Sequence, residues 1–128
     1  MPHVTLEYSG NLSARIDFSA RCGLVHGAML DSGLFELGAV RVRALRSEHC
    51  AIADQLPENA FIDVSVRIGT GRTAEEKQRL GEALFAAMAG SLGALFETPH
   101  FALSLEIRDI DPVLSWKKNA MHARLRGT

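Results

Sequence analysis

Apolar and polar residues alternate along several short stretches of this chain. The alternation is clear from His3 to Tyr8, within Leu37 to Leu45 and from Ala60 to Ile68. A period of two is typical of a strand with one buried face. We interpret Phe101 to Ile107 as a fourth strand of the same kind.

A helix is expected between the first two strands. The Ser9-Gly10-Asn11 segment interrupts the alternation, and Ser13 is a suitable N-cap residue. Asp31-Ser32-Gly33 ends the predicted helix. Apolar residues recur at every fourth position of this helix, at Ile16, Ala20 and Leu24. The stripe is widened by Phe18, Val25 and Ala28.

A second helix is expected between the third and fourth strands. Gly69-Thr70-Gly71-Arg72 forms a turn, and Thr73 with Glu76 has the spacing of a capping box. Thr98-Pro99 ends the helical stretch. The apolar stripe between these signals consists of Leu80, Leu84, Met88, Leu92 and Leu95.

The two halves of the chain match at an offset of sixty residues. Val4 corresponds to Val64 and Leu6 to Val66, which indicates an internal duplication of a β-α-β unit. Right-handed crossovers then give an α+β fold, a four-stranded sheet with two helices on one face. The predicted domain spans 1–128, with pseudo-repeats 2–58 and 60–110 and a C-terminal tail 111–128. We expect apolar residues on the bare sheet face to require self-association.

Composition limits the classes of function. The 128 residues carry a net charge of −1, whereas general nucleic-acid binders usually have a basic surplus. The chain lacks the long apolar run of a transmembrane helix, and its start lacks the features of a signal peptide, so we expect a cytoplasmic protein. The two cysteines lack CxxC spacing and the five histidines lack ligand spacing, so no metal site is expected. A hydrophobic content of 47% favours an oligomer.

Pro2, directly behind the initiator methionine, is the leading candidate for chemistry. Aminopeptidases readily remove Met1 when proline follows, and removal would leave a free secondary amine at Pro2. An α-amino group has a pKa of roughly 7.7–8.0, and burial or nearby cations lower it. Such an amine would be a neutral base near neutral pH.

The polar residues are not duplicated with the strands. Pro2 corresponds to Ile62, and Leu12 stands where the second half has Arg72. The second strand carries Arg41 and Arg43, where the fourth strand has neutral residues. We therefore expect one set of polar groups, distributed over both halves, to form a single site.

These residues together resemble the tautomerase superfamily. The stretch Ile68-Gly69-Thr70-Gly71-Arg72-Thr73 is similar to the corresponding segment of short 4-oxalocrotonate tautomerase chains. Over its full length the chain is most similar to the 5-carboxymethyl-2-hydroxymuconate isomerase family. Three further segments carry that resemblance, namely Gly38 to Arg43, Leu103 to Ile107 and the tail from Trp116 to Ala123.

The resemblance implies an isomerase that converts 5-carboxymethyl-2-hydroxymuconate to its 2-oxo isomer in homoprotocatechuate degradation. Pro2 would be the catalytic base, and Arg41 and Arg72 would bind the carboxylate groups of the substrate. Arg43 would either assist or pair with a glutamate across a subunit contact. Trp116 would either line the pocket or anchor an interface. The resemblance also implies a homotrimer and no metal or organic cofactor.

Two alternatives remain open at this stage. One is a different reaction of the superfamily on a small unsaturated acid, such as hydration, decarboxylation or dehalogenation. The other is a non-catalytic trimer that acts by binding. Substrate, stereochemistry and the subunit that donates each arginine are not determined by the sequence.

Overall fold

The computed structural model describes residues 1–127 and contains one four-stranded sheet. The predicted domain and tail extend to Thr128, which lies outside the described residues. The strands are β1 (His3–Ser9), β2 (Arg41–Ser47), β3 (Ala60–Ile68) and β4 (Phe101–Asp109). The longer helices are α1 (Phe18–Asp31) and α2 (Ala74–Ser91), and the short ones are α3 (Gly93–Phe96) and α4 (Met121–Arg126). Two 3₁₀ turns, Gly10–Leu12 and Leu37–Ala39, precede α1 and β2.

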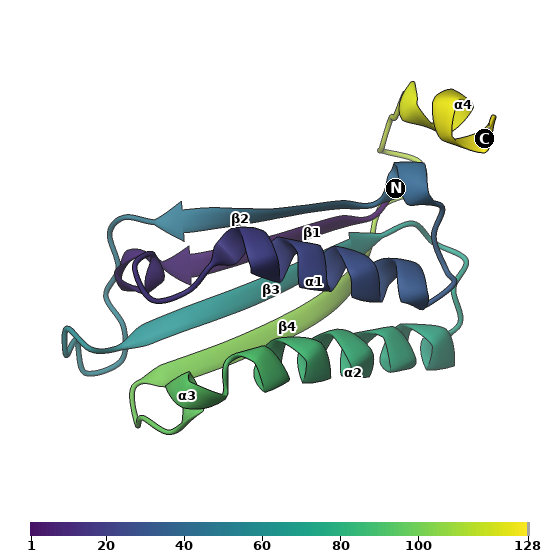
Figure 1. Ribbon diagram of the computed structural model, residues 1–128. Coiled ribbons are helices and arrows are strands. Elements are labelled where there is room, and N and C mark those ends of the chain that lie inside the picture. The colour runs from purple at the N-terminus through teal and green to yellow at the C-terminus, as the bar shows by residue number, and fades with distance from the viewer. Residues whose placement is uncertain (128) are drawn as a thin grey trace.

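The predicted duplicated topology is confirmed. The strand order is β2-β1-β3-β4. Within each half the strands are parallel, β1 with β2 and β3 with β4, and the two halves meet where β1 runs antiparallel to β3. Both long helices lie on the same face of the sheet (Figure 1). This is the α+β arrangement of paired β-α-β units that was predicted from the sequence match between the two halves.

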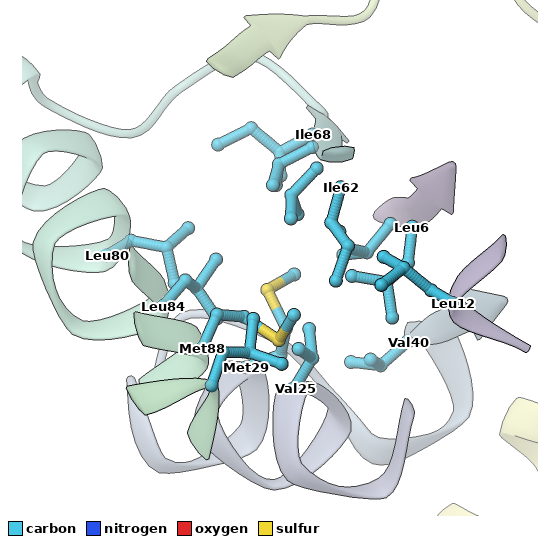
Figure 2. Packing of buried hydrophobic residues seen from close by; sticks show 14 of the residues in the cluster. Leu6, Leu12, Val25, Met29, Val40, Ile62, Ile68, Leu80, Leu84 and Met88 are labelled. Carbon is cyan, nitrogen blue, oxygen red and sulfur yellow. The ribbon is translucent and has the colours of Figure 1, made fainter. Parts of the chain in front are cut away.

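The hydrophobic core lies between that sheet face and the two helices. The central strands supply Val4, Leu6, Val64 and Val66, all fully buried. Figure 2 shows Val25 and Met29 of α1 packing toward Leu84 and Met88 of α2 beneath the sheet. At roughly 25 cal/mol per Å² of apolar area, this layer is the main stabilising contribution to the fold.

The first helix begins later than predicted. Asp17, not Ser13, is its N-cap, and the Asp17 side chain accepts a hydrogen bond from the Ala20 amide at 3.0 Å. Residues 10–12 form a 3₁₀ turn instead, which buries Leu12. The predicted stripe is confirmed in part. Val25 is buried, and Ile16, Phe18 and Ala28 pack against the core, but Ala20 is exposed, Leu24 is 39% exposed and Met29 is buried instead.

The second helix follows its prediction closely. The capping box is present, with Thr73 accepting from the Glu76 amide and the Glu76 carboxylate accepting from the Thr73 amide. Leu80, Leu84 and Met88 form the buried stripe. The helix ends at Ser91 and a separate short turn, α3, carries Leu95.

Two other boundaries differ from expectation. The second strand begins at Arg41 rather than Leu37, because Leu37–Ala39 folds as a 3₁₀ turn. The tail, which has no strong periodicity in the sequence, ends in the short helix α4. No helix among residues 1–127 is long and apolar enough to span a membrane.

The uncovered sheet face is mostly polar, so the expectation of exposed apolar residues there holds only in part, at Leu45, which pairs with Glu7 and is 51% exposed. Strand register places Arg41, His3, Arg67 and Arg108 in one row across all four strands. Four residues further along β1, the acidic Glu7 and Asp63 are cross-strand partners on the same face. The alternation explains this result, because the strands direct their apolar residues toward the helices and leave the polar ones outside.

Candidate active site

A cavity of about 910 Å³ lies at the end of the sheet where the chain begins. Four segments form its walls: the N-terminal residues, the loop before β2, the loop after β3 and the tail that follows β4. Figure 1 shows the N-terminus beside the turn before β2, with α4 above them. The topology thus brings both halves and the tail to one place.

Pro2 is buried and lines this cavity. Its carbonyl accepts a hydrogen bond from the Arg41 amide at 3.3 Å, which joins the start of β1 to the start of β2. The Met1 amine also lies in the cavity wall. Burial, followed by the charges of Lys117, Arg72 and Arg41, lowers the pKa of this amine below its ordinary value of 8.0. Low polarity and nearby cations both disfavour an ammonium group, so an amine here is held toward its neutral form.

The Arg72 guanidinium is fixed at the cavity by three contacts. It donates to the Leu34 carbonyl at 2.8 Å and to the Gly69 carbonyl at 3.3 Å, and it stacks over the Phe35 ring at 4.8 Å. A Cβ placed on Gly69 would lie 3.4 Å from Arg72 Nη1 and 3.8 Å from the Met1 nitrogen. The guanidinium and the amine therefore lie on the same side of Gly69, close to each other.

Arg41 and Arg43 differ in their relation to the cavity. Arg41 donates to the Ala39 carbonyl at 2.8 Å, and Ala39 is part of the cavity wall. The Arg41 charge reaches the terminal amine, although its side chain is not among the residues that line the cavity. Arg43 is exposed, lies outside the cavity and contacts His3 Nδ1 at 3.2 Å. The structure thus brings Pro2 and Arg72 together, places Arg41 at the edge and leaves Arg43 outside.

Trp116 lines the cavity from the tail while 85% of it is exposed. Val113 and Leu114, just before it, are also exposed, at 77% and 69%. The segment is ordered by Asp111, whose carboxylate accepts from the Val113 and Leu114 amides at 2.8 and 2.9 Å. Its apolar side chains face outward at the mouth of the cavity, which suits either predicted role of Trp116.

The tail contributes cavity residues to which the sequence analysis assigned no role. Lys117, Asn119 and His122 line the cavity, and the charge of Lys117 helps to lower the pKa of the Met1 amine. Asn119 donates to the Gly38 carbonyl at 2.7 Å, which fastens the tail to the segment before β2. The resemblance covered these tail residues as a block. Only their position beside Trp116 could have indicated a role for any one of them.

Glu36 and Arg126 form a second attachment of the tail. Two hydrogen bonds join them, at 2.7 and 2.5 Å, and His122 Nδ1 lies 3.4 Å from the same carboxylate. Glu36 is the one acidic residue of the cavity wall, and these contacts occupy it. The remaining charged groups of the wall are cations, including Arg67, Arg72 and Lys117. The cavity is therefore suited to a ligand with several negative charges.

The described residues contain no group of three or more histidine, cysteine or acidic side chains placed to hold a metal ion. Cys22 lies in α1 and Cys50 in the loop after β2, and both are free thiols. The chemistry that the cavity supports with its own groups is proton transfer by an amine among guanidinium and ammonium groups.

Comparisons with known proteins agree with this geometry. Residues 2–125 match the family model described as 5-carboxymethyl-2-hydroxymuconate isomerase. A curated relative from Escherichia coli, 5-carboxymethyl-2-hydroxymuconate Delta-isomerase, is 32% identical over 96% of this chain and 98% of its own. The crystal structure of a 5-carboxymethyl-2-hydroxymuconate isomerase from Deinococcus radiodurans R1 is 37% identical. It superposes with a TM-score of 0.89 over 96% of this chain and 92% of that one.

More distant structures share the fold alone. A fused 4-OT symmetric trimer is 12% identical, with a TM-score of 0.67 over 91% of this chain and 93% of its own. The paired β-α-β arrangement is thus common to proteins whose sequences have diverged widely.

Proposed function

The chain belongs to the 5-carboxymethyl-2-hydroxymuconate isomerase family, and from this premise we propose that it isomerises that muconate to its 2-oxo form. The observation that carries the proposal is the terminal amine in a cavity whose free charges are cations. The substrate is a dienol with three carboxylates, so its charge matches the cavity.

In the proposed mechanism Pro2 becomes the terminal residue when Met1 is removed. Pro2 is already buried, so its amine would be at least as shielded from water as the Met1 amine. The neutral amine takes the proton of the 2-hydroxyl group. It then delivers a proton to C5, which completes the isomerisation and returns the amine to its starting state.

Arg72 and Arg41 are proposed to stabilise the negative charge that develops on the 2-oxygen and the C1 carboxylate. Arg72 suits this role because its backbone contacts and the Phe35 ring hold its guanidinium in place before substrate binds. Preorganised cations usually make the largest contribution to such catalysis. The same charges hold the amine neutral, so substrate binding and base activation depend on the same residues.

We place the enzyme in aromatic catabolism in the cytoplasm and propose that it acts as a homotrimer. The charges on the uncovered sheet face support association. The row of basic residues across the strands and the acidic pair, Glu7 and Asp63, lie at different positions along the strands on this face. Copies arranged around a symmetry axis can pair these opposite charges. Arg41 and Arg43 belong to this face and would then lie near a neighbouring subunit.

The direct test is a spectrophotometric assay on 5-carboxymethyl-2-hydroxymuconate, with intact-mass measurement of the same sample. We expect turnover by protein that lacks Met1 and little turnover by protein that retains it. A processed protein that does not isomerise this substrate would refute the proposed function. Sedimentation analysis tests the trimer separately.

A further inference from the structure

Lys117, like Arg67, is a cation of the cavity wall that the proposed mechanism leaves without a role. It lines the cavity, and of the charged groups around the Met1 amine it lowers the pKa of that amine most, second only to burial. Among residues 1–127 its ammonium group forms no ion pair and no hydrogen bond with another side chain. Removal of Met1 therefore leaves this ammonium group free beside the position that the Met1 amine occupied.

Two attachments hold Lys117 in position. On one side Asp111 orders the turn that begins the tail, accepting from Val113 and Leu114. On the other side Asn119 donates to the Gly38 carbonyl at 2.7 Å and accepts from the Met121 amide at 2.9 Å. A residue between two such fixed points presents its side chain to the cavity at a low cost in conformational entropy.

The other candidate cations are less suited to a third carboxylate. Arg126 is paired with Glu36. Arg67 lies on the uncovered sheet face, where its charge acts on His3, and it is not among the groups that act on the terminal amine. Arg72, Arg41 and Lys117 come from three different segments, the loop after β3, the start of β2 and the tail. They can therefore surround one ligand from separate directions.

We propose that Lys117 binds the third carboxylate of the substrate, the one on the carboxymethyl group. It would thereby set the preference of this enzyme for tricarboxylates over the dicarboxylate 2-hydroxymuconate. This inference rests on the proposed function, which requires two carboxylate-binding arginines but does not require a third cation. An ammonium group on a flexible stem suits this carboxylate, which does not develop charge during the reaction.

The test measures kcat/KM for both substrates with the Lys117→Met variant and the native enzyme, well above the pKa of the amine. We expect Lys117→Met to lower kcat/KM for the carboxymethyl substrate about 10- to 100-fold, from the loss of one charged hydrogen bond. The value for 2-hydroxymuconate should change less than about threefold, and Lys117→Arg should restore most of the preference. Lys118→Met is the matched control, because Lys118 is the next residue and is exposed like Lys117 but does not line the cavity.

Equal losses for both substrates would overturn the inference and leave Lys117 a role in tuning the amine or ordering the tail. A native enzyme that converts neither substrate would refute the proposed function instead. A binding measurement then decides on Lys117 by itself. Calorimetry with propane-1,2,3-tricarboxylate and with glutarate should show weaker binding of the first compound alone in Lys117→Met, and unchanged binding of both would reject the inference.

Discussion

The two halves of the molecule share a backbone plan but not a chemistry. β1-α1-β2 and β3-α2-β4 each place a parallel strand pair under one helix, and their central strands are equally buried. At the cavity the halves diverge, since Pro2 stands where the second half has Ile62 and Arg72 stands where the first half has Leu12. The apolar positions preserve a scaffold, and the polar differences between equivalent positions locate the site.

The largest effect is expected when Pro2 of the first half is replaced by isoleucine, the residue at the equivalent position of the second half. Pro2→Ile should retain Met1, because isoleucine after the initiator does not permit its removal, and no proline amine is formed. We expect kcat to fall about 10²- to 10⁴-fold, the usual contribution of a general base. The assay is paired with intact mass and thermal melting. Loss of melting cooperativity would mean that the fold, not the base, was lost, and near-native turnover would exclude Pro2 as the base.

Arg72→Leu makes the reverse exchange, copying Leu12 into the second half. Losing a preorganised guanidinium should lower kcat/KM about 10²- to 10³-fold. The kcat/KM of Arg72→Lys should lie between those of the native enzyme and Arg72→Leu, because lysine keeps the charge but lacks the planar guanidinium group. Steady-state kinetics measure both variants. Arg79→Leu, which removes an exposed guanidinium from α2, is the control and should change kcat/KM less than about twofold.

A comparison of unfolding free energies tests whether residues sixty positions apart in the two helices occupy equivalent places in the fold. Leu24 and Leu84 correspond in sequence, but Leu24 is 39% exposed and Leu84 is fully buried. Leu84→Ala should reduce the free energy of unfolding by about 2–5 kcal/mol, and Leu24→Ala by less than about 1 kcal/mol. Urea denaturation measures both values, and similar losses would contradict the structural alignment of the helices.

The pH dependence of kcat/KM tests whether the cations around the cavity lower the pKa of the catalytic amine. A base is active when neutral, so activity falls as pH drops through its pKa. Burial and the charges of Lys117, Arg72 and Arg41 lower the pKa of the Met1 amine. We expect the Pro2 amine, which takes its place after Met1 is removed, to be shifted in the same direction, so the acidic limb should lie below the ordinary pKa of a free proline amine. Arg41→Gln removes one of these charges and should move the limb to higher pH. An unmoved limb would show that Arg41 does not act on the base.

The smallest effect is expected for Arg43. Its guanidinium contacts His3 at 3.2 Å on the uncovered sheet face, outside the cavity. If Arg43 acts only within its own subunit, Arg43→Gln should change kcat/KM of the assembled enzyme less than about threefold, since exposed contacts contribute little. A loss comparable to that of Arg72→Leu would place Arg43 in the site, supplied across a subunit contact.

The sequence predicted those parts of the fold whose signals are local. Strand β3 has the predicted bounds because every second residue is apolar, and α2 begins at its capping box because Thr73 and Glu76 satisfy each other's amides. The start of α1 was misplaced because Ser13 and Asp17 both suit an N-cap. Only the packing of Leu12 into the core decides between them.

The site was predictable in part for a similar reason. Pro2 and Arg72 stood out because they break the repeat, and the structure brings both to one cavity. Lys117 has no equivalent in either half to be compared with, since the tail lies beyond the repeats. Its place depends on the contact of Asn119 with Gly38, a pairing distant in sequence that no local pattern indicates.

The cavity walls come from the first residues and from the tail, which has a consequence for how the enzyme matures. While the ribosome is still making the middle of the chain, the amino end is already exposed and the tail does not yet exist. An aminopeptidase can then reach Met1 without obstruction. Once Asn119 has docked on Gly38 and Arg126 on Glu36, Met1 is half-buried in the cavity wall, so we expect trimming to be faster during translation than after folding.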